Sequence, residues 1–208
     1  MDIKFQIVRP EEIEARSMQM IGEELGDAVL DPEQEPIIKR VIHTSADFEY
    51  LHTLKFSQNA VALAKQAIRD GAHIVTDTRM ASVGVNAARL AKFGGQVHCF
   101  MADEDVAAQA KREGSTRATV CMQKAAELDK PLIIAIGNAP TALIELDKLI
   151  QAGKIKPALV IGVPVGFVNV IESKELIMRS GVPYIVARGR KGGSNVAAAI
   201  CNALIYNS

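Results

Sequence analysis

The chain has 208 residues, of which 49% are apolar and 23% charged, and its 24 Lys and Arg balance 24 Asp and Glu. This length and composition predict a single domain over residues 1–208 with a substantial buried core. Balanced charge and an aromatic content of 4% disfavour nucleic-acid binding. The longest nearly apolar stretch, 158–171, is too short to cross a membrane, and the N-terminus lacks a signal-peptide pattern. We therefore expect a cytoplasmic protein with no membrane partner.

The first 70 residues contain no convincing strand and are predicted to form helices over 10–24, 35–50 and 59–69. In the third of these segments the apolar residues recur with a period near 3.6, as they do on one face of a helix. The acidic, proline-containing stretch 31–36 is predicted to be a loop between the first two helices rather than a domain boundary.

Beyond residue 70, short runs rich in Ile and Val alternate with helical patterns. The runs do not alternate with polar residues, which is typical of parallel strands covered by helices on both faces. We predict an α/β fold with a doubly wound, mainly five-stranded parallel sheet, helices on both faces and an N-terminal helical segment. The predicted strands are His73–Thr76, Val97–Met101, Leu132–Ile136, Ala158–Val163 and Tyr184–Ala187.

Three of these strands end in a glycine-bearing loop that opens into a helical pattern, at 137–141, 162–167 and 189–194. The last helix is predicted to begin at an N-cap, Ser194. Free backbone N–H groups at a helix start suit carboxylate or phosphate, and ligands of such sheets bind beyond the carboxyl ends of the strands. The loops therefore predict a pocket for a large polyanion.

The second predicted helix has two distinct faces. Ile37, Ile38, Val41 and Ile42 form one stripe, and Arg40, His43 and Asp47 fall together on the opposite side. From the pattern alone a solvated polar face is the favoured interpretation. The alternative is a histidine acid or base beside an anion-binding arginine.

Ser17 is predicted to lie on the inward stripe of the first helix with Ile13, Met20 and Ile21. A serine in such a place commonly donates to the carbonyl four residues earlier. The functional alternative is a hydroxyl that points into a ligand cavity.

Several other chemistries lack their sequence motifs. There is no dinucleotide-binding or P-loop glycine motif and no nucleophile elbow, and the histidines lack metal-ligand spacing. No metal site is therefore expected. Cys99, Cys121 and Cys201 are predicted to be reduced core thiols.

The chain resembles the precorrin-8X methylmutase family of cobalamin biosynthesis, from the first predicted helix to the last. The strings Gly-Asn-Ala-Pro-Thr-Ala-Leu and Pro-Val-Gly-Phe-Val are the most specific part of the match. The resemblance implies an isomerase that moves a methyl group from C11 to C12 of ring C in a corrinoid macrocycle, with no cofactor. The matching stretches are 40–43, 135–143, 162–168, 172–174, 181–183 and 188–194.

The resemblance also implies roles for individual residues. His43 falls on the family's catalytic histidine, which is thought to lend a proton to the macrocycle, and Ser17 and Arg40 fall on substrate-binding positions. The family works as a homodimer with the site near the subunit interface. Because the substrate carries many carboxylates, we expect further contacts from residues at strand and helix ends: Thr78, Arg117, Gly137, Asn138, Arg188 and Gly193.

The segments Thr44–Asp47 and Thr76–Thr78 look more like the family branch that acts on the cobalt-containing ring than the metal-free branch. Two functions of other classes remain as alternatives, namely a non-catalytic corrinoid carrier and a nucleotide-binding α/β protein.

Overall fold

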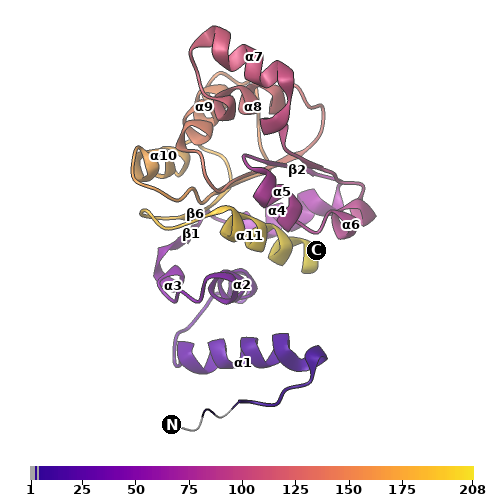
Figure 1. Cartoon of the computed structure of the whole chain (residues 1–208), viewed down its shortest axis with the longest axis vertical. Coiled ribbons are helices and arrows are strands. Elements are labelled where there is room, and N and C mark those ends of the chain that lie inside the picture. The colour runs from indigo at the N-terminus through magenta and orange to yellow at the C-terminus, as the bar shows by residue number, and fades with distance from the viewer. Residues whose placement is uncertain (1–2, 4) are drawn as a thin grey trace.

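The computed structural model describes residue 3 and residues 5–208, and it has an α/β fold built on a six-stranded sheet (Figure 1). The strands follow the order β1-β6-β5-β4-β2-β3, and every neighbouring pair is parallel except β1 and β6. Among the five parallel strands, chain order runs outward in both directions from the junction of β2 and β4, which confirms the doubly wound prediction. The strands are β1 (Leu54–Phe56), β2 (His73–Thr76), β3 (Val97–His98), β4 (Leu132–Ile136), β5 (Leu159–Gly162) and β6 (Tyr184–Ala187).

Two details of the strand prediction were wrong. The first 70 residues do contain a strand, since β1 pairs antiparallel with β6 at the sheet edge. It has only three residues, so it carries too little periodicity to stand out in a sequence. β3 is shorter than predicted because a 3-10 turn, η3 (Phe100–Ala102), follows it directly.

Helices cover both faces of the sheet, as predicted, and each face has its own apolar core. All residues of β2, β4 and β5 are buried between the two layers, which explains their continuous Ile- and Val-rich composition. One layer contains α4 (Ala60–Arg69), α5 (Arg79–Gly84) and α11 (Ser194–Tyr206), with α6 (Ala87–Leu90) and η2 (Ala91–Phe93) beside them. The other contains α8 (Arg117–Ala125), α9 (Pro140–Gln151) and α10 (Val170–Ile177), with α7 (Glu104–Glu113) outermost.

Two further helical layers extend the molecule below α11 (Figure 1). α2 (Glu35–Ser45) packs on α11 rather than on the sheet, and α1 (Ile13–Leu25), which follows the short turn η1 (Pro10–Glu12), packs on α2. The predicted apolar stripe of α2 is buried, with Val41 at 0% exposure. The predicted helix over 35–50 is in fact two, because Ala46 adopts a left-handed conformation (φ 52°) and α3 (Tyr50–Thr53) starts anew.

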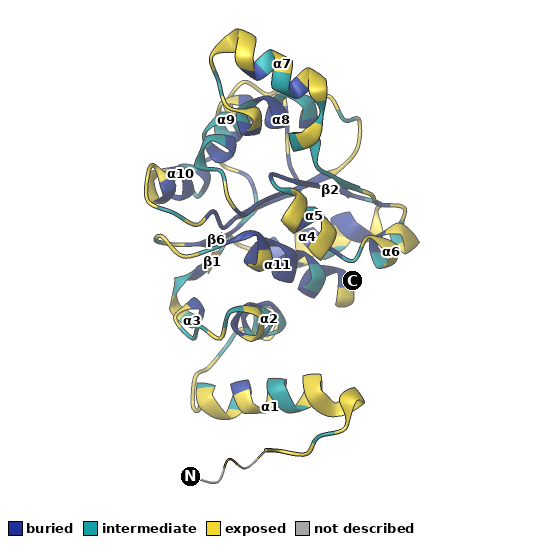
Figure 2. Ribbon diagram, in the orientation of Figure 1, coloured by how far each residue is buried: buried dark blue, intermediate teal, exposed yellow. Residues whose placement is uncertain are grey.

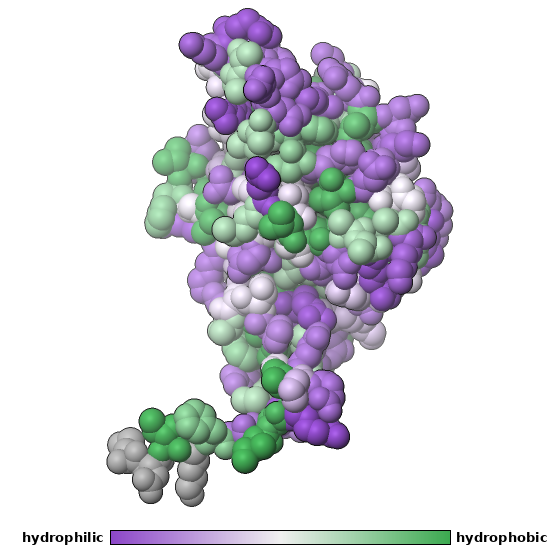
Figure 3. Space-filling view, turned by 45° about the vertical axis from the view of Figure 1, so that its right-hand side comes forward, coloured by the Kyte–Doolittle hydropathy of each residue, from purple (hydrophilic) through white to green (hydrophobic). Residues whose placement is uncertain are grey.

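α1 is attached to the molecule by very little buried surface (Figure 2). Ile21 is its single buried residue, and Ile13 and Met20, predicted to point inward, are 54% and 39% exposed. The part of the chain before α1 also exposes apolar side chains, including Phe5 and Ile7, and forms a green extension at the base of Figure 3. We call residues 3 and 5–25 the N-terminal arm. In the described chain no helix is both long and apolar enough to span a membrane.

A partly buried histidine pair at the sheet edge is expected to make the fold sensitive to acid. His73 of β2 and His98 of β3 share a hydrogen bond of 2.8 Å between Nδ1 and Nε2, and their rings stack. Burial lowers the pKa of both histidines, and for His73 the neighbouring His98 and Lys130 lower the pKa further. As the pH falls, both histidines therefore stay neutral in the folded protein at pH values where a histidine in the unfolded chain is already protonated.

We predict that the free energy of unfolding falls as the pH is lowered below about 6.5, the ordinary pKa of histidine, and is highest above it. Urea unfolding at a series of pH values measures this. A His73→Leu, His98→Leu double variant should show a flatter pH dependence, whereas His52→Gln, at an exposed histidine, should leave the slope unchanged. An equal slope in the double variant would contradict the assignment.

Candidate active site

The crevice at the junction of β2 and β4 is filled by the chain's own carboxylate. Asp77 directly follows β2, is wholly buried, and accepts hydrogen bonds from the backbone N–H groups of Gly137 (2.8 Å), Asn138 (2.8 Å) and Ala139 (2.7 Å). Burial raises the pKa of Asp77, and these three donors oppose that rise. The N–H groups expected to bind substrate at the first glycine loop are thus already occupied, and that part of the prediction for Gly137 is wrong.

The second and third glycine loops bind each other. The Gly166 N–H donates to the Arg190 carbonyl (3.2 Å), and the Gly193 N–H donates to the Val163 carbonyl (2.9 Å). A Cβ at Gly192 would lie 2.1 Å from that same Val163 oxygen, so a glycine is needed for the close approach. Gly193 therefore does not offer its N–H to a ligand, contrary to the predicted pocket of free donors.

Lys174 of α10 secures the third loop from below. Its side chain is wholly buried, and its ammonium donates to the carbonyls of Gly189 and Lys191, both at 2.8 Å. Burial lowers the pKa of Lys174 to about 8. The loop geometry is thus set by a cation inside the protein.

Thr78 also has a structural role. Its hydroxyl caps α5 by accepting from the Ala81 N–H (3.0 Å) and lies 2.8 Å from the Ser194 hydroxyl. The residue before Ser194, Gly193, is the N-cap of α11, so the predicted cap at Ser194 was one residue late. The hydroxyl pair ties the first turn of α5 to the first turn of α11.

His43 lies on α2 between two open hollows. One, of about 220 Å³, lies between α1 and α2 and is lined by Ser17, Met20 and His43 among others. The other, of about 370 Å³, lies between α2, α5 and α11 and is lined by His43 and Arg40. His43 is exposed, so it can reach a ligand in either hollow.

Arg40 has an anionic partner within the chain. Its guanidinium pairs with Glu14 of α1 (2.7 Å) and lies 6.0 Å from the centre of the Tyr206 ring on α11. The Ser17 hydroxyl donates to the Ile13 carbonyl (2.9 Å), which is the common arrangement for a helical serine, while its side chain still lines the smaller hollow.

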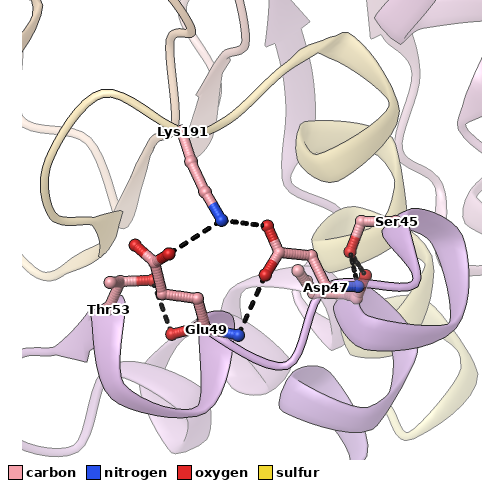
Figure 4. Close-up of polar contacts among 6 residues, drawn as sticks. Ser45, Asp47, Glu49, Thr53 and Lys191 are labelled. Carbon is pink, nitrogen blue, oxygen red and sulfur yellow. Dashed lines mark hydrogen bonds and ion pairs between the residues drawn. The ribbon is translucent and has the colours of Figure 1, made fainter.

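Asp47 does not share the face of Arg40 and His43, because α2 ends at Ser45. Its carboxylate instead pairs with Lys191 (2.6 Å), which also contacts Glu49 (2.8 Å; Figure 4). This ion pair lowers the pKa of Asp47 and joins the end of α2 to the third glycine loop. Sequence reasoning missed the pairing, since the partners are 144 residues apart.

Three other predicted contacts are not brought to His43. Arg188 pairs with Glu175 of α10 (2.6 Å), Arg117 is exposed at the start of α8, and Asn138 is exposed after β4. None of the three lines either hollow in this chain. Among the described residues, no group of three His, Cys, Asp or Glu side chains is placed to hold a metal ion.

The family model for precorrin-8X methylmutase (CbiC) matches residues 12–207. The chain belongs to the precorrin-8X methylmutase family. It is thus an isomerase of cobalamin biosynthesis that moves a methyl group within its substrate, as the resemblance implied.

Individual methylmutases match the chain along nearly its whole length. The cobalt-precorrin-8 methylmutase of Priestia megaterium is 48% identical over 95% of this chain and 88% of its own. That of Salmonella typhimurium is 44% identical over 97% of both chains. The crystal structure of precorrin-8x methyl mutase from Thermus thermophilus has a TM-score of 0.85 and 41% identity, covering 94% of this chain and 96% of that one.

Removing the Asp77 carboxylate should destabilise the fold severely. Asp77→Ala leaves three backbone N–H groups without an acceptor, and a single buried unsatisfied donor costs about 1–3 kcal/mol. We expect the free energy of unfolding to drop by roughly 3 kcal/mol or more, measured by urea denaturation. Asp129→Ala, at an exposed acid, is the matched control. A drop of less than about 1 kcal/mol would show that the loop can satisfy itself without Asp77.

Proposed function

We propose that this methylmutase moves a methyl group from C11 to C12 of cobalt-precorrin-8 to give a cobyrinic-acid product, with His43 as the proton donor. The observation that carries this proposal is the placement of His43, exposed at the junction of two hollows and one helical turn after Arg40. No other described histidine lines either hollow.

His43 would lend a proton to the conjugated macrocycle, the methyl group would migrate from C11 to C12, and the proton would return to His43. The reaction is an isomerisation, so no atom or electron is gained or lost. Protonation eases the migration because the positive charge is delocalised over the conjugated system. A positioned acid of this kind contributes roughly 10²–10⁴-fold to a rate.

Arg40 would hold one carboxylate side arm of the macrocycle next to His43. Glu14 supports this role, since its carboxylate pairs with Arg40 in this structure and shows how a carboxylate binds there. Ser17 would contribute from the smaller hollow.

The cobalt-containing ring is favoured over the metal-free ring as substrate. The relatives from Priestia megaterium, Leptospira interrogans and Salmonella typhimurium, at 44–48% identity, are named cobalt-precorrin-8 methylmutases. The relative from Pseudomonas aeruginosa, named precorrin-8X methylmutase, is 40% identical.

His43→Ala should lose most turnover, roughly 10²-fold or more, and still bind corrinoid. The measurement is the absorbance change on incubation with cobalt-precorrin-8. If His43→Ala turns over near the wild-type rate, His43 is not the acid. If the wild type binds the ring without any spectral change, the protein is a carrier rather than an isomerase.

Arg40→Ala should act mainly on affinity. We expect weaker binding of the cobyrinic-acid product, and the wild-type affinity should fall with added salt because the contact is between charges. Unchanged affinity in a titration of Arg40→Ala would mean that Arg40 belongs to a solvated face.

We also propose that the methylmutase acts in the cytoplasm as a homodimer of single-domain subunits. The exposed apolar residues of the N-terminal arm support an interface with a second copy, since Phe5 and Ile7 are 84% and 101% exposed. The two hollows around His43 are open to solvent, which also supports a homodimer. A second subunit that covered the hollows would exclude water from the reacting ring.

An Ile13→Ser, Met20→Ser double variant tests the homodimer, because both side chains are exposed on the N-terminal arm. We expect a shift from dimer to monomer in sedimentation velocity, together with loss of turnover. Leu63→Ser, at an exposed leucine of α4, should leave the sedimentation unchanged. A wild type that sediments as a monomer at micromolar concentration would refute the proposal.

A further inference from the structure

Three helices wall the larger hollow beside His43. α2 provides one wall with Arg40 and His43, α5 provides a second with Met80 and Gly84, and α11 provides a third. The residues of α11 that line it are Asn195, Ala198, Ala199 and Asn202.

The floor of this hollow is rigid. A Cβ at Gly84 would lie 2.8 Å from the Ala198 Cβ, so α5 and α11 approach too closely there for a side chain at Gly84. Both polar groups of the Asn202 side-chain amide are hydrogen-bonded. Its oxygen accepts from the Asn86 N–H and its nitrogen donates to the Gly84 carbonyl, each at 2.8 Å. The hollow therefore keeps its shape without a ligand.

Asn195 differs from Asn202, although both lie on the same face of α11. It is exposed in the first turn of the helix, and within residues 3 and 5–208 its side-chain amide makes no hydrogen bond to the protein. Its amide is thus free to bind a ligand, and it shares its hollow with Arg40 and His43.

Met80 provides an apolar counterpart on α5. Its side chain is 68% exposed and lines the hollow. Val83, on the same helix, is 79% exposed but does not line it. An adaptable thioether next to a histidine suits contact with the flat apolar face of a conjugated ring.

We propose that Asn195 is a positioning residue for the methyl shift, and that its amide donates to a side-arm carboxylate of the macrocycle while Met80 packs against the ring. This inference rests on the proposed function and specifies which of the two hollows holds the ring. It also places the polar contact one residue after Ser194, whose hydroxyl is committed to Thr78.

The test measures binding of cobyrinic acid by calorimetry, and KM and kcat with cobalt-precorrin-8. Asn195→Ala should weaken binding and raise KM by about tenfold or more, since a hydrogen bond to a charged group is at stake, with little change in kcat. Asn195→Asp should weaken binding further, because a like charge faces the side arm. Added salt should partly restore its affinity, opposite to the salt effect on wild type. A residue that only supported the fold would not give this reversal.

Met80→Ala should lower affinity by a few-fold, because part of the apolar contact with the ring is lost. Val83→Ala and Gln96→Ala, at exposed positions away from the hollow, are the matched controls and should bind as wild type. Thermal unfolding confirms that each variant is folded.

If both Asn195 variants bind product and turn over substrate with wild-type affinity and KM, the inference about Asn195 is wrong. If His43→Ala is inactive in the same experiments, the proposed function still stands. If His43→Ala is fully active, the proposed function fails instead. A loss of binding in Val83→Ala equal to that in Met80→Ala would equally overturn the assignment of the hollow.

Discussion

The three hydrogen bonds that Asp77 accepts at the junction of β2 and β4 hold the first glycine loop against the end of β2. In doubly wound sheets this junction is the usual place for an anionic ligand, because the neighbouring chain segments diverge there and a helix N-terminus points into the gap. Here an internal carboxylate takes the position of that anion at the start of α9. The three N–H groups are therefore not free for an external anion.

The two open hollows that His43 lines lie instead around α2, which packs on α11. Because α2 buries Ile37, Ile38, Val41 and Ile42 against the core that includes α11, its remaining face turns His43 outward. The ion pair of Lys191 with Asp47 and Glu49 joins the end of α2 to the third glycine loop, and the buried Lys174 ammonium holds the same loop through two of its carbonyls. The third glycine loop thus supports the end of α2 through charge.

Sequence reasoning succeeded where a local pattern carries the information. The strands are continuous apolar runs in the sequence because helices cover both faces of the sheet. The apolar stripe on α2 was predicted from helical periodicity. It failed where the outcome depends on distant partners. Nothing near the first glycine loop shows that Asp77, 60 residues earlier, would occupy it. Likewise the left-handed turn at Ala46, a residue with no special preference for it, removed Asp47 from the face of His43.

The candidate site was likewise predicted only in part. His43, Arg40 and Ser17 were found through the family resemblance and lie at the two hollows, whereas Arg117, Asn138 and Arg188 do not. Asn195 carried no signal in the sequence, because an asparagine in the first turn of a helix is ordinary. Only the contrast with the fully bonded Asn202 distinguishes it.

The slight attachment of α1 has a consequence for the dynamics of the chain. In an isolated subunit, a helix that buries only Ile21 can separate from α2 at a small fraction of the free energy of global unfolding. Its amide protons would then exchange with solvent through local opening, while those of β4 exchange only when the whole sheet unfolds. Each opening also releases Glu14 from Arg40, so the local stability of α1 sets how often the guanidinium is available to an incoming carboxylate.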